Sequence, residues 1–134
     1  SLIPGELSVD GDVVEVLLGT DRIRLDAETL EQMPWCRDWR GRPITVGIRP
    51  EHLAPAKGSE PFARTLHGRV AAVEDLGGAA IATVSLGVRG VDVHVRVRPP
   101  VRMAAGDPIE LVVSVHRLRF FDPETGAALR SAGS

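Results

Sequence analysis

The 134-residue sequence is short of the residue types from which catalytic, metal and nucleic-acid sites are usually built. It has one cysteine, Cys36, one lysine, Lys57, no tyrosine and five aromatic side chains. A lone cysteine cannot close an internal disulfide, which fits a reducing compartment. Five aromatic rings are few for stacking single-stranded nucleic acid. A net charge of −2 argues against a strongly basic surface for nucleic acid or anionic membranes.

The usual motifs of catalysis and targeting are also absent. There is no phosphate-binding P-loop, no Gly-x-Ser-x-Gly elbow and no cysteine–histidine spacing of a zinc site. No apolar run approaches the roughly 18–20 residues of a membrane-spanning helix, and no charged-then-apolar start indicates a signal peptide. The chain opens on Ser1 rather than methionine, so we expect a processed chain or a piece of a longer one.

The remaining reactive side chains form no catalytic pattern. Nothing marks a base or oxyanion donors for Cys36, so nucleophilic catalysis is not predicted. Its neighbours Trp35 and Trp39 are predicted either to cover a sheet edge or partner surface, or to pack locally beneath an arginine. The histidines never stand two or four residues apart, so we interpret all four as structural or surface residues rather than metal ligands. They are His52, His67, His94 and His116.

Glycines and prolines punctuate short apolar segments about every ten residues, a pattern typical of an all-β sandwich or barrel. The clearest strand spans residues 91–98, where four valines alternate with polar residues that include His94 and Arg96. A period of two places the valines on one face and the polar side chains on the other. Pro99 cannot donate to a sheet ladder, so the strand should end before it.

The same reasoning predicts about nine short strands and at most one short helix. Asp10-Gly11 is a hairpin signal that pairs residues 6–9 with 13–18. Asp26 should cap a short helix, and Pro50 should begin a single turn. The expected helix spans 26–33, the turn 50–53, a loop 53–60, and further strands 22–25, 44–48, 68–73, 80–86 and 109–115. The length fits one domain, residues 1–134, with 54–62 as the best place for an internal seam.

Three ordered stretches carry a more specific signal. They are Gly47-Ile48-Arg49-Pro50-Glu51-His52-Leu53, then Gly68-Arg69-Val70-Ala71-Ala72-Val73-Glu74-Asp75-Leu76-Gly77, and finally Phe121-Asp122-Pro123-Glu124-Thr125-Gly126. In this order they resemble the C-terminal regulatory domain of the ATP-binding subunits of carbohydrate ABC importers, which include maltose, trehalose and glycerol-3-phosphate importers. That domain is of the TOBE, OB-fold-like type, and the resemblance spans nearly the whole chain.

The resemblance implies that the turns in these stretches lie near the contact between two regulatory domains, or near the ATPase domain. Pro50 fixes φ at a charged corner. Asp122 and Thr125 can cap a turn in which Gly126 takes a positive φ. No catalytic, cofactor or metal residue is expected. The candidate interface and regulatory residues are Arg49, Pro50, Glu51, His52, Glu74, Leu76, Gly77, Phe121 and Asp122.

The resemblance also implies an ATPase domain before Ser1, where ATP and magnesium would bind. The chain itself is expected to bind no cofactor and to hydrolyse no ATP. Its implied role is to hold two ATPase subunits together and to receive regulatory proteins. The implied partners are a second copy in a homodimer, its own ATPase domain and, through that domain, membrane permease subunits. The implied location is cytoplasmic, peripheral on the inner face of the cell membrane.

Two other functions stay open at this point. A TOBE-type module could bind an oxyanion such as molybdate, with Arg49, Gly77 and Gly78 supplying cationic and backbone N–H groups. An oligonucleotide-binding role rests on the fold type alone, and the negative net charge and scarce aromatic residues oppose it.

Overall fold

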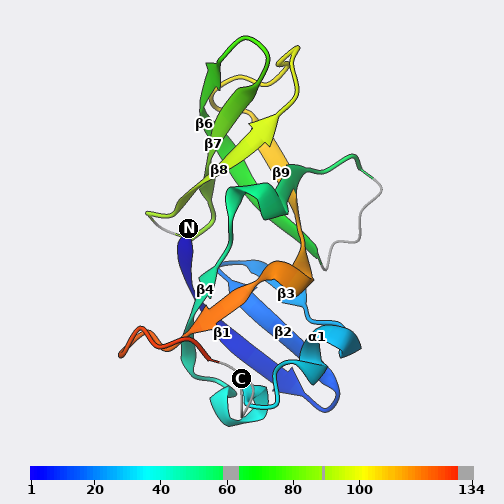
Figure 1. The fold of residues 1–134 in the computed structure, drawn as a ribbon, viewed down its shortest axis with the longest axis vertical. Helices are drawn as coiled ribbons and strands as arrows, with labels where there is room; N and C mark the ends of the chain where they lie inside the picture. The colour runs from blue at the N-terminus through cyan, green and yellow to red at the C-terminus, as the bar shows by residue number, and fades with distance from the viewer. Residues whose placement is uncertain (59–63, 89, 130–134) are drawn as a thin grey trace.

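The chain folds into two five-stranded antiparallel sheets at the two ends of an elongated molecule (Figure 1). This computed structural model describes residues 1–58, 64–88 and 90–129. Their elements are ten strands, one short α-helix and three 3-10 turns. The all-β, OB-fold-like class expected from the sequence is confirmed. No helix within the described ranges is long and apolar enough to cross a membrane.

The first sheet is built around the N-terminal strand. Its strands are β1 (Leu2–Asp10), β2 (Val13–Leu18), β3 (Asp21–Arg24), β4 (Pro43–Gly47) and β10 (Arg119–Phe121), in the spatial order β10-β4-β1-β2-β3. The predicted hairpin is confirmed, because Asp10 pairs with Val13 across a turn in which Gly11 has a φ of 60°. β10 brings the far end of the chain back beside β4 (Figure 1).

The second sheet contains β5 (Leu53–Pro55), β6 (Thr65–Asp75), β7 (Ala80–Leu86), β8 (Asp92–Val97) and β9 (Pro108–Val113), in the order β5-β9-β6-β7-β8. The two edge strands, β5 and β8, also contact each other, so the sheet curls until its edges nearly meet. β8 confirms the predicted alternation: Val93 and Val95 are buried, whereas His94 and Arg96 are exposed.

The helical elements are α1 (Ala27–Glu31), η1 (Cys36–Trp39), η2 (Pro50–His52) and η4 (Val115–Arg117). Asp26 caps α1 as predicted, since its side chain accepts a hydrogen bond from the backbone N–H of Thr29 at 2.8 Å. The turn η2 begins at Pro50, also as predicted. η1 was not predicted. The Arg42 guanidinium lies 3.9 Å from the ring centroid of Trp39, the last residue of η1. For Trp39, the structure thus shows the second of the two predicted alternatives, local packing beneath an arginine.

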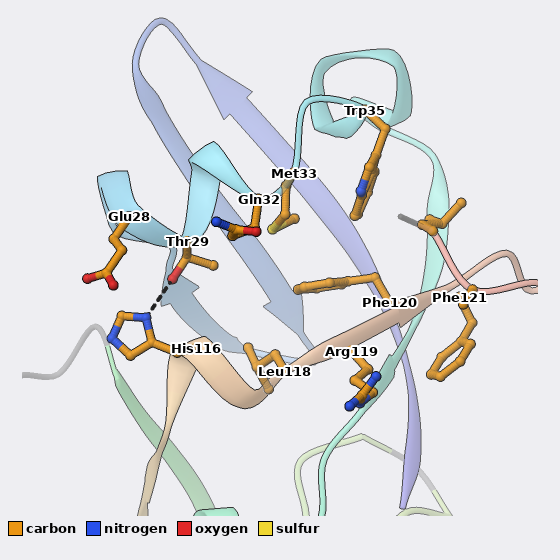
Figure 2. Close-up of a pocket in the computed structure, with 12 residues that line it drawn as sticks. Glu28, Thr29, Gln32, Met33, Trp35, His116, Leu118, Arg119, Phe120 and Phe121 are labelled. Atoms are coloured by element: carbon orange, nitrogen blue, oxygen red, sulfur yellow. Dashed lines mark hydrogen bonds between the residues drawn. The ribbon is translucent and has the colours of Figure 1, made fainter. Parts of the chain in front are cut away.

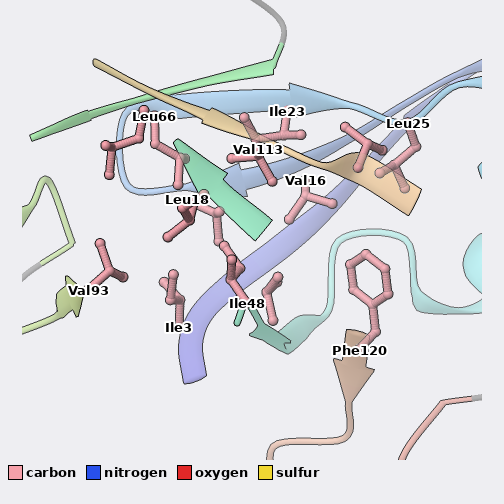
Figure 3. Close-up of a cluster of buried hydrophobic side chains, with 14 of the residues drawn as sticks. Ile3, Val16, Leu18, Ile23, Leu25, Ile48, Leu66, Val93, Val113 and Phe120 are labelled. Carbon is pink, nitrogen blue, oxygen red and sulfur yellow. The ribbon is translucent and has the colours of Figure 1, made fainter. Parts of the chain in front are cut away.

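One hydrophobic core joins the two sheets. Ile3 of β1 and Ile23 of β3 belong to the same buried cluster as Leu66 of β6 and Val113 of β9. Figure 3 draws Ile23 and Val113 among the side chains of this cluster. Because apolar burial is the main favourable contribution to folding, the shared cluster is what holds the sheets against each other.

Two strands depart from the sequence expectations. The loop expected over 53–60 is wrong at its start: residues 53–55 form β5, because Leu53 is buried and pairs with Val113 of β9. β10 was not predicted, and its three residues are too few to show an alternation. The seam expected near 54–62 lies partly outside the described residues, which omit 59–63.

The structure gives Gly68 a steric role. Gly68 pairs with Leu86 of β7 on one side and Ile109 of β9 on the other. A Cβ at this position would lie 2.6 Å from the backbone oxygen of Ser85 and 2.7 Å from Val84 Cγ1. Neither atom is the end of a flexible side chain, so the two strands would have to move apart.

We expect Gly68→Ala to lower the free energy of unfolding by about 1–3 kcal/mol, because the added methyl group overpacks the β6–β7 ladder. The matched control is Gly78→Ala, where nothing lies within 4 Å of the added Cβ. That variant should stay within about 0.5 kcal/mol of the parent chain. Urea unfolding of the three proteins measures both effects. Equal stabilities for the two variants would contradict the steric role of Gly68.

Candidate functional site

The turn η2 forms a charged corner directly after β4. Arg49 is the extended residue before the turn, and Pro50 occupies its first position. The backbone N–H of Ser114 donates to the carbonyl oxygen of His52 at 3.1 Å, which ties the corner to the end of β9. Inside the corner, the His52 Nδ1 atom is buried and has no hydrogen-bond partner within the described ranges. The corner therefore has fixed backbone geometry, while Glu51 remains exposed.

This corner forms one wall of a groove over the outer face of the second sheet. The groove has a volume of about 580 Å³ and separates η2 from side chains of β6, β7 and β8. We call it the corner groove. Its lining residues are Pro50, Glu51, Ala72, Val73, Glu74, Ile81, Thr83, His94, Val95 and Arg96. Three of the nine predicted interface residues, from two separate stretches of sequence, are thus brought together.

The corner groove carries both signs of charge on an apolar floor. Glu51 and Glu74 supply carboxylates, whereas Arg96 supplies a guanidinium. In the described part of the chain, neither carboxylate makes an ion pair. The His94 Nδ1 atom lies 3.2 Å from the hydroxyl oxygen of Thr83. Such a surface can form charge-assisted hydrogen bonds with a partner that offers both signs.

The β6–β7 hairpin ends in an exposed apolar tip. Leu76 has 57% of its surface exposed, and among the described leucines only Leu2, at 66%, is more exposed. The backbone N–H of Gly77 donates to the Asp75 carboxylate at 2.9 Å, and Gly77 has a φ of 92°. The turn therefore presents Leu76 to solvent in a fixed position. Leu76 does not itself line the corner groove, but it lies two residues beyond Glu74, which does.

The other predicted residues lie elsewhere. Arg49 and Phe121 line a small recess of about 200 Å³ beside β10, separate from the corner groove. Asp122 has a structural role: its carboxylate accepts a hydrogen bond from the backbone N–H of Glu124 at 2.8 Å. The predicted turn is confirmed, with Gly126 at a φ of 74°. Asp122 is thus accounted for by its turn.

The residues considered for an oxyanion lie on different elements. Arg49 follows β4, whereas Gly77 and Gly78 form the tip of the β6–β7 hairpin. At both glycines, an added Cβ would meet nothing within 4 Å. No group of three histidine, cysteine, aspartate or glutamate side chains within the described ranges is placed to hold a metal ion. Arg49 and the two glycines thus stand on separate elements, and both glycines lie on an open part of the hairpin.

Sequence reasoning missed that His94 and Arg96 face Glu51. The alternation of β8 did place both side chains on its exposed face, but Glu51 is more than forty residues away in the chain. Their proximity follows from the packing of η2 against β8. The proximity of these residues could therefore not be predicted without the curved arrangement of the second sheet.

A separate group of charges joins α1 to the second half of the chain. The Asp26 carboxylate lies 3.3 Å from Arg64 Nη2 and 3.7 Å from His116 Nε2. Hydrogen bonds from the side chain and backbone of Thr29 hold the pKa of Asp26 below its ordinary value. The nearby charges of His116 and Arg64 lower it further, against the opposing effect of desolvation.

The fold and the groove together define a small β-domain with a charged groove on its surface. Residues 46–121 match the family model of the TOBE domain. The chain belongs to the TOBE domain family. The matched range begins within β4 and ends with β10, so it includes the corner, the hairpin and the whole second sheet.

The curated relatives include import ATP-binding proteins. The chain is 37% identical over 93 residues to the maltose/maltodextrin import ATP-binding protein MalK of Vibrio parahaemolyticus, covering 68% of this chain and 24% of that protein. It is 37% identical over 87 residues to the sn-glycerol-3-phosphate import ATP-binding protein UgpC of Paraburkholderia xenovorans, covering 65% and 23%. The chain thus spans about a quarter of the length of these relatives.

A solved structure shares the fold. The cytoplasmic molybdate-binding protein ModG, crystallised with molybdate bound, superposes with a TM-score of 0.67. The match covers 92% of this chain and 96% of ModG, at 16% sequence identity. The arrangement of strands is therefore shared across nearly the full length of both chains, although few side chains are.

The lowered pKa of Asp26 predicts a stability contribution that depends on pH. The contribution is present above the ordinary aspartate pKa of about 3.9 and is lost as pH falls through the lower folded-state pKa. Asp26→Asn keeps a capping oxygen but removes the charge. We expect this variant to melt below the parent chain at pH 7, with a gap that narrows as the pH is lowered from 7 to 2.

Thermal unfolding between these pH values measures the difference. Asp38→Asn is the matched control, because Asp38 is exposed and makes no ion pair in the described part of the chain. A gap between parent and Asp26→Asn that stays constant at all pH values would contradict the assignment.

Proposed function

We propose that this chain is the regulatory and dimerising domain of the ATP-binding subunit of a carbohydrate ABC importer. It would act in the cytoplasm at the inner face of the membrane, linked through an ATPase domain to the permease subunits. The relatives, which are import ATP-binding proteins for maltose/maltodextrin and sn-glycerol-3-phosphate, support the class of transporter. The corner groove supports the contact role.

The groove is suited to a second copy of the same chain. In a two-fold symmetric dimer, the same patch occurs on both sides, so each charged group must meet a complementary group of the other copy. The corner groove meets this requirement, because the carboxylates of Glu51 and Glu74 can face Arg96 and His94 of the partner copy. Leu76 adds an exposed apolar side chain.

The rigidity of the groove fits a domain that must persist through an ATPase cycle. Each wall belongs either to a paired strand or to η2, which is fixed at Pro50 and His52. Packed β-structure deforms little, so a contact made here would survive while a neighbouring interface opens and closes. Regulatory proteins could then bind the faces that the dimer leaves free.

Sedimentation equilibrium of the purified chain from micromolar to millimolar concentration tests the proposal. We expect a concentration-dependent dimer. Glu51→Arg should raise the dimer dissociation constant about tenfold or more, because it places like charges across the interface. Its melting temperature should stay close to that of the parent chain, since the Glu51 side chain is exposed and unpaired in the described part of the chain.

The matched control is Glu31→Arg, which makes the same charge change at an exposed position on α1 outside the corner groove. A chain that stays monomeric at millimolar concentration contradicts the dimerising role. Loss of association together with unfolding contradicts the role of Glu51. A rise in melting temperature with molybdate or sulfate would instead support an oxyanion-binding function.

A further inference from the structure

A second pocket lies at the other end of the molecule, between the α1–η1 segment and the C-terminal strand. Its volume is about 440 Å³. We call it the aromatic pocket, and Figure 2 shows it in close-up. One side comes from residues 28–35, and the other from residues 116–129. None of the residues of the corner groove lines it, so its function is not explained by the proposed dimer contact.

The middle of the pocket is apolar and aromatic. Met33 and Phe120 line it although only 4% and 5% of their surfaces are exposed. The rings of Trp35 and Phe120 lie 5.7 Å apart at an interplanar angle of 60°. Further apolar lining comes from Leu118, Phe121, Ala128 and Leu129. Apolar walls of this kind favour a flat ring of a ligand. The carbon atoms of such a ring gain close van der Waals contacts with the walls and are removed from water.

Polar groups lie at the two ends of this apolar middle. At one end, the hydroxyl oxygen of Thr29 is 3.1 Å from His116 Nδ1. At the other end is the indole of Trp35, whose Nε1 atom is buried and has no acceptor among the residues that the structure describes. In the view of Figure 2, Met33 and Phe120 lie between these two ends. A buried N–H without an acceptor is costly, so a ligand that brings an oxygen atom to it gains affinity.

We propose that the aromatic pocket binds a small ring-shaped molecule that carries oxygen substituents on opposite edges. The ring lies between Met33 and Phe120. One oxygen accepts a hydrogen bond from Trp35 Nε1–H, and the other meets the Thr29–His116 pair. A small molecule suits the site better than one inserted side chain of a protein, because the volume falls within the range of about 300–1,000 Å³ typical of small-molecule sites.

The indole N–H of Trp35 provides a direct reporter. The chain has two tryptophans, so a ¹H–¹⁵N spectrum of the labelled 134-residue chain contains two indole signals, and Trp39→Phe assigns them. The probe is 4-hydroxyacetophenone, a benzene ring with oxygen at both ends. We expect the Trp35 signal to move downfield and to saturate as probe is added, while the Trp39 signal stays in place.

A matched probe separates the hydrogen bond from apolar packing. In 4-ethyltoluene, methyl and ethyl groups replace the hydroxyl and acetyl groups of the first probe. It should leave the Trp35 indole signal without a downfield shift at equal concentration. A Trp35 signal that does not move with 4-hydroxyacetophenone, or that moves equally with both probes, would overturn the proposal.

Variants give a second and independent measurement. Trp35→Phe keeps an aromatic ring but removes the donor, so it should weaken the affinity for 4-hydroxyacetophenone about three- to tenfold. Backbone amide signals of residues 28–33 report this affinity and also show whether the variant is folded. Trp39→Phe is the matched control, because Trp39 lies beneath Arg42 outside the pocket, and it should bind the probe as the parent chain does. Unchanged affinity in Trp35→Phe would exclude the indole hydrogen bond.

Discussion

The central position of β6 is the constraint on which the rest of the structure depends. This strand pairs with β7 along one side and β9 along the other. Within it, the backbone N–H of His67 donates to the carboxylate of Asp21 in β3 at 3.0 Å, which ties the second sheet to the first. Gly68 lets the backbone of β7 approach closely. Beyond it, a register shift between Val70 and Ala72 bends the strand toward the hairpin that carries Leu76. The same strand therefore anchors the core and supplies one side of the corner groove.

The sequence predicts local structure well where the signal lies within one element. The alternation of β8, the cap at Asp26 and the turn at Asp122 each depend on residues a few positions apart, and all three are confirmed. β5 and β10 could not be predicted in this way, because three residues show no period and their strand character comes from distant partners. The corner groove could not be predicted from the sequence for the same reason. Glu51 and Arg96 line it together only because the second sheet curls.

The shared strand arrangement and the exposed side chains carry different information about this molecule. ModG shares the strand arrangement at 16% identity, so that arrangement tolerates the replacement of most side chains. Buried valines, leucines and isoleucines of similar volume can maintain it in many combinations. Similar folds therefore say little about what is bound, and the exposed groups decide it. In this chain those groups are the mixed charges beside η2 and the exposed Leu76.

The two sites are connected through a single strand. β4 leads directly into the η2 corner at Arg49, and its Val46 pairs with Phe120, which lines the aromatic pocket. A ligand against Phe120 would thus touch the strand next to the one that positions Glu51. A displacement of Phe120 would reach the η2 corner only if the β4–β10 ladder has two stable arrangements, because packed structure is not continuously deformable. Any effect must be reciprocal: a ligand that tightens the dimer must itself bind the dimer more tightly than the monomer, by the same factor.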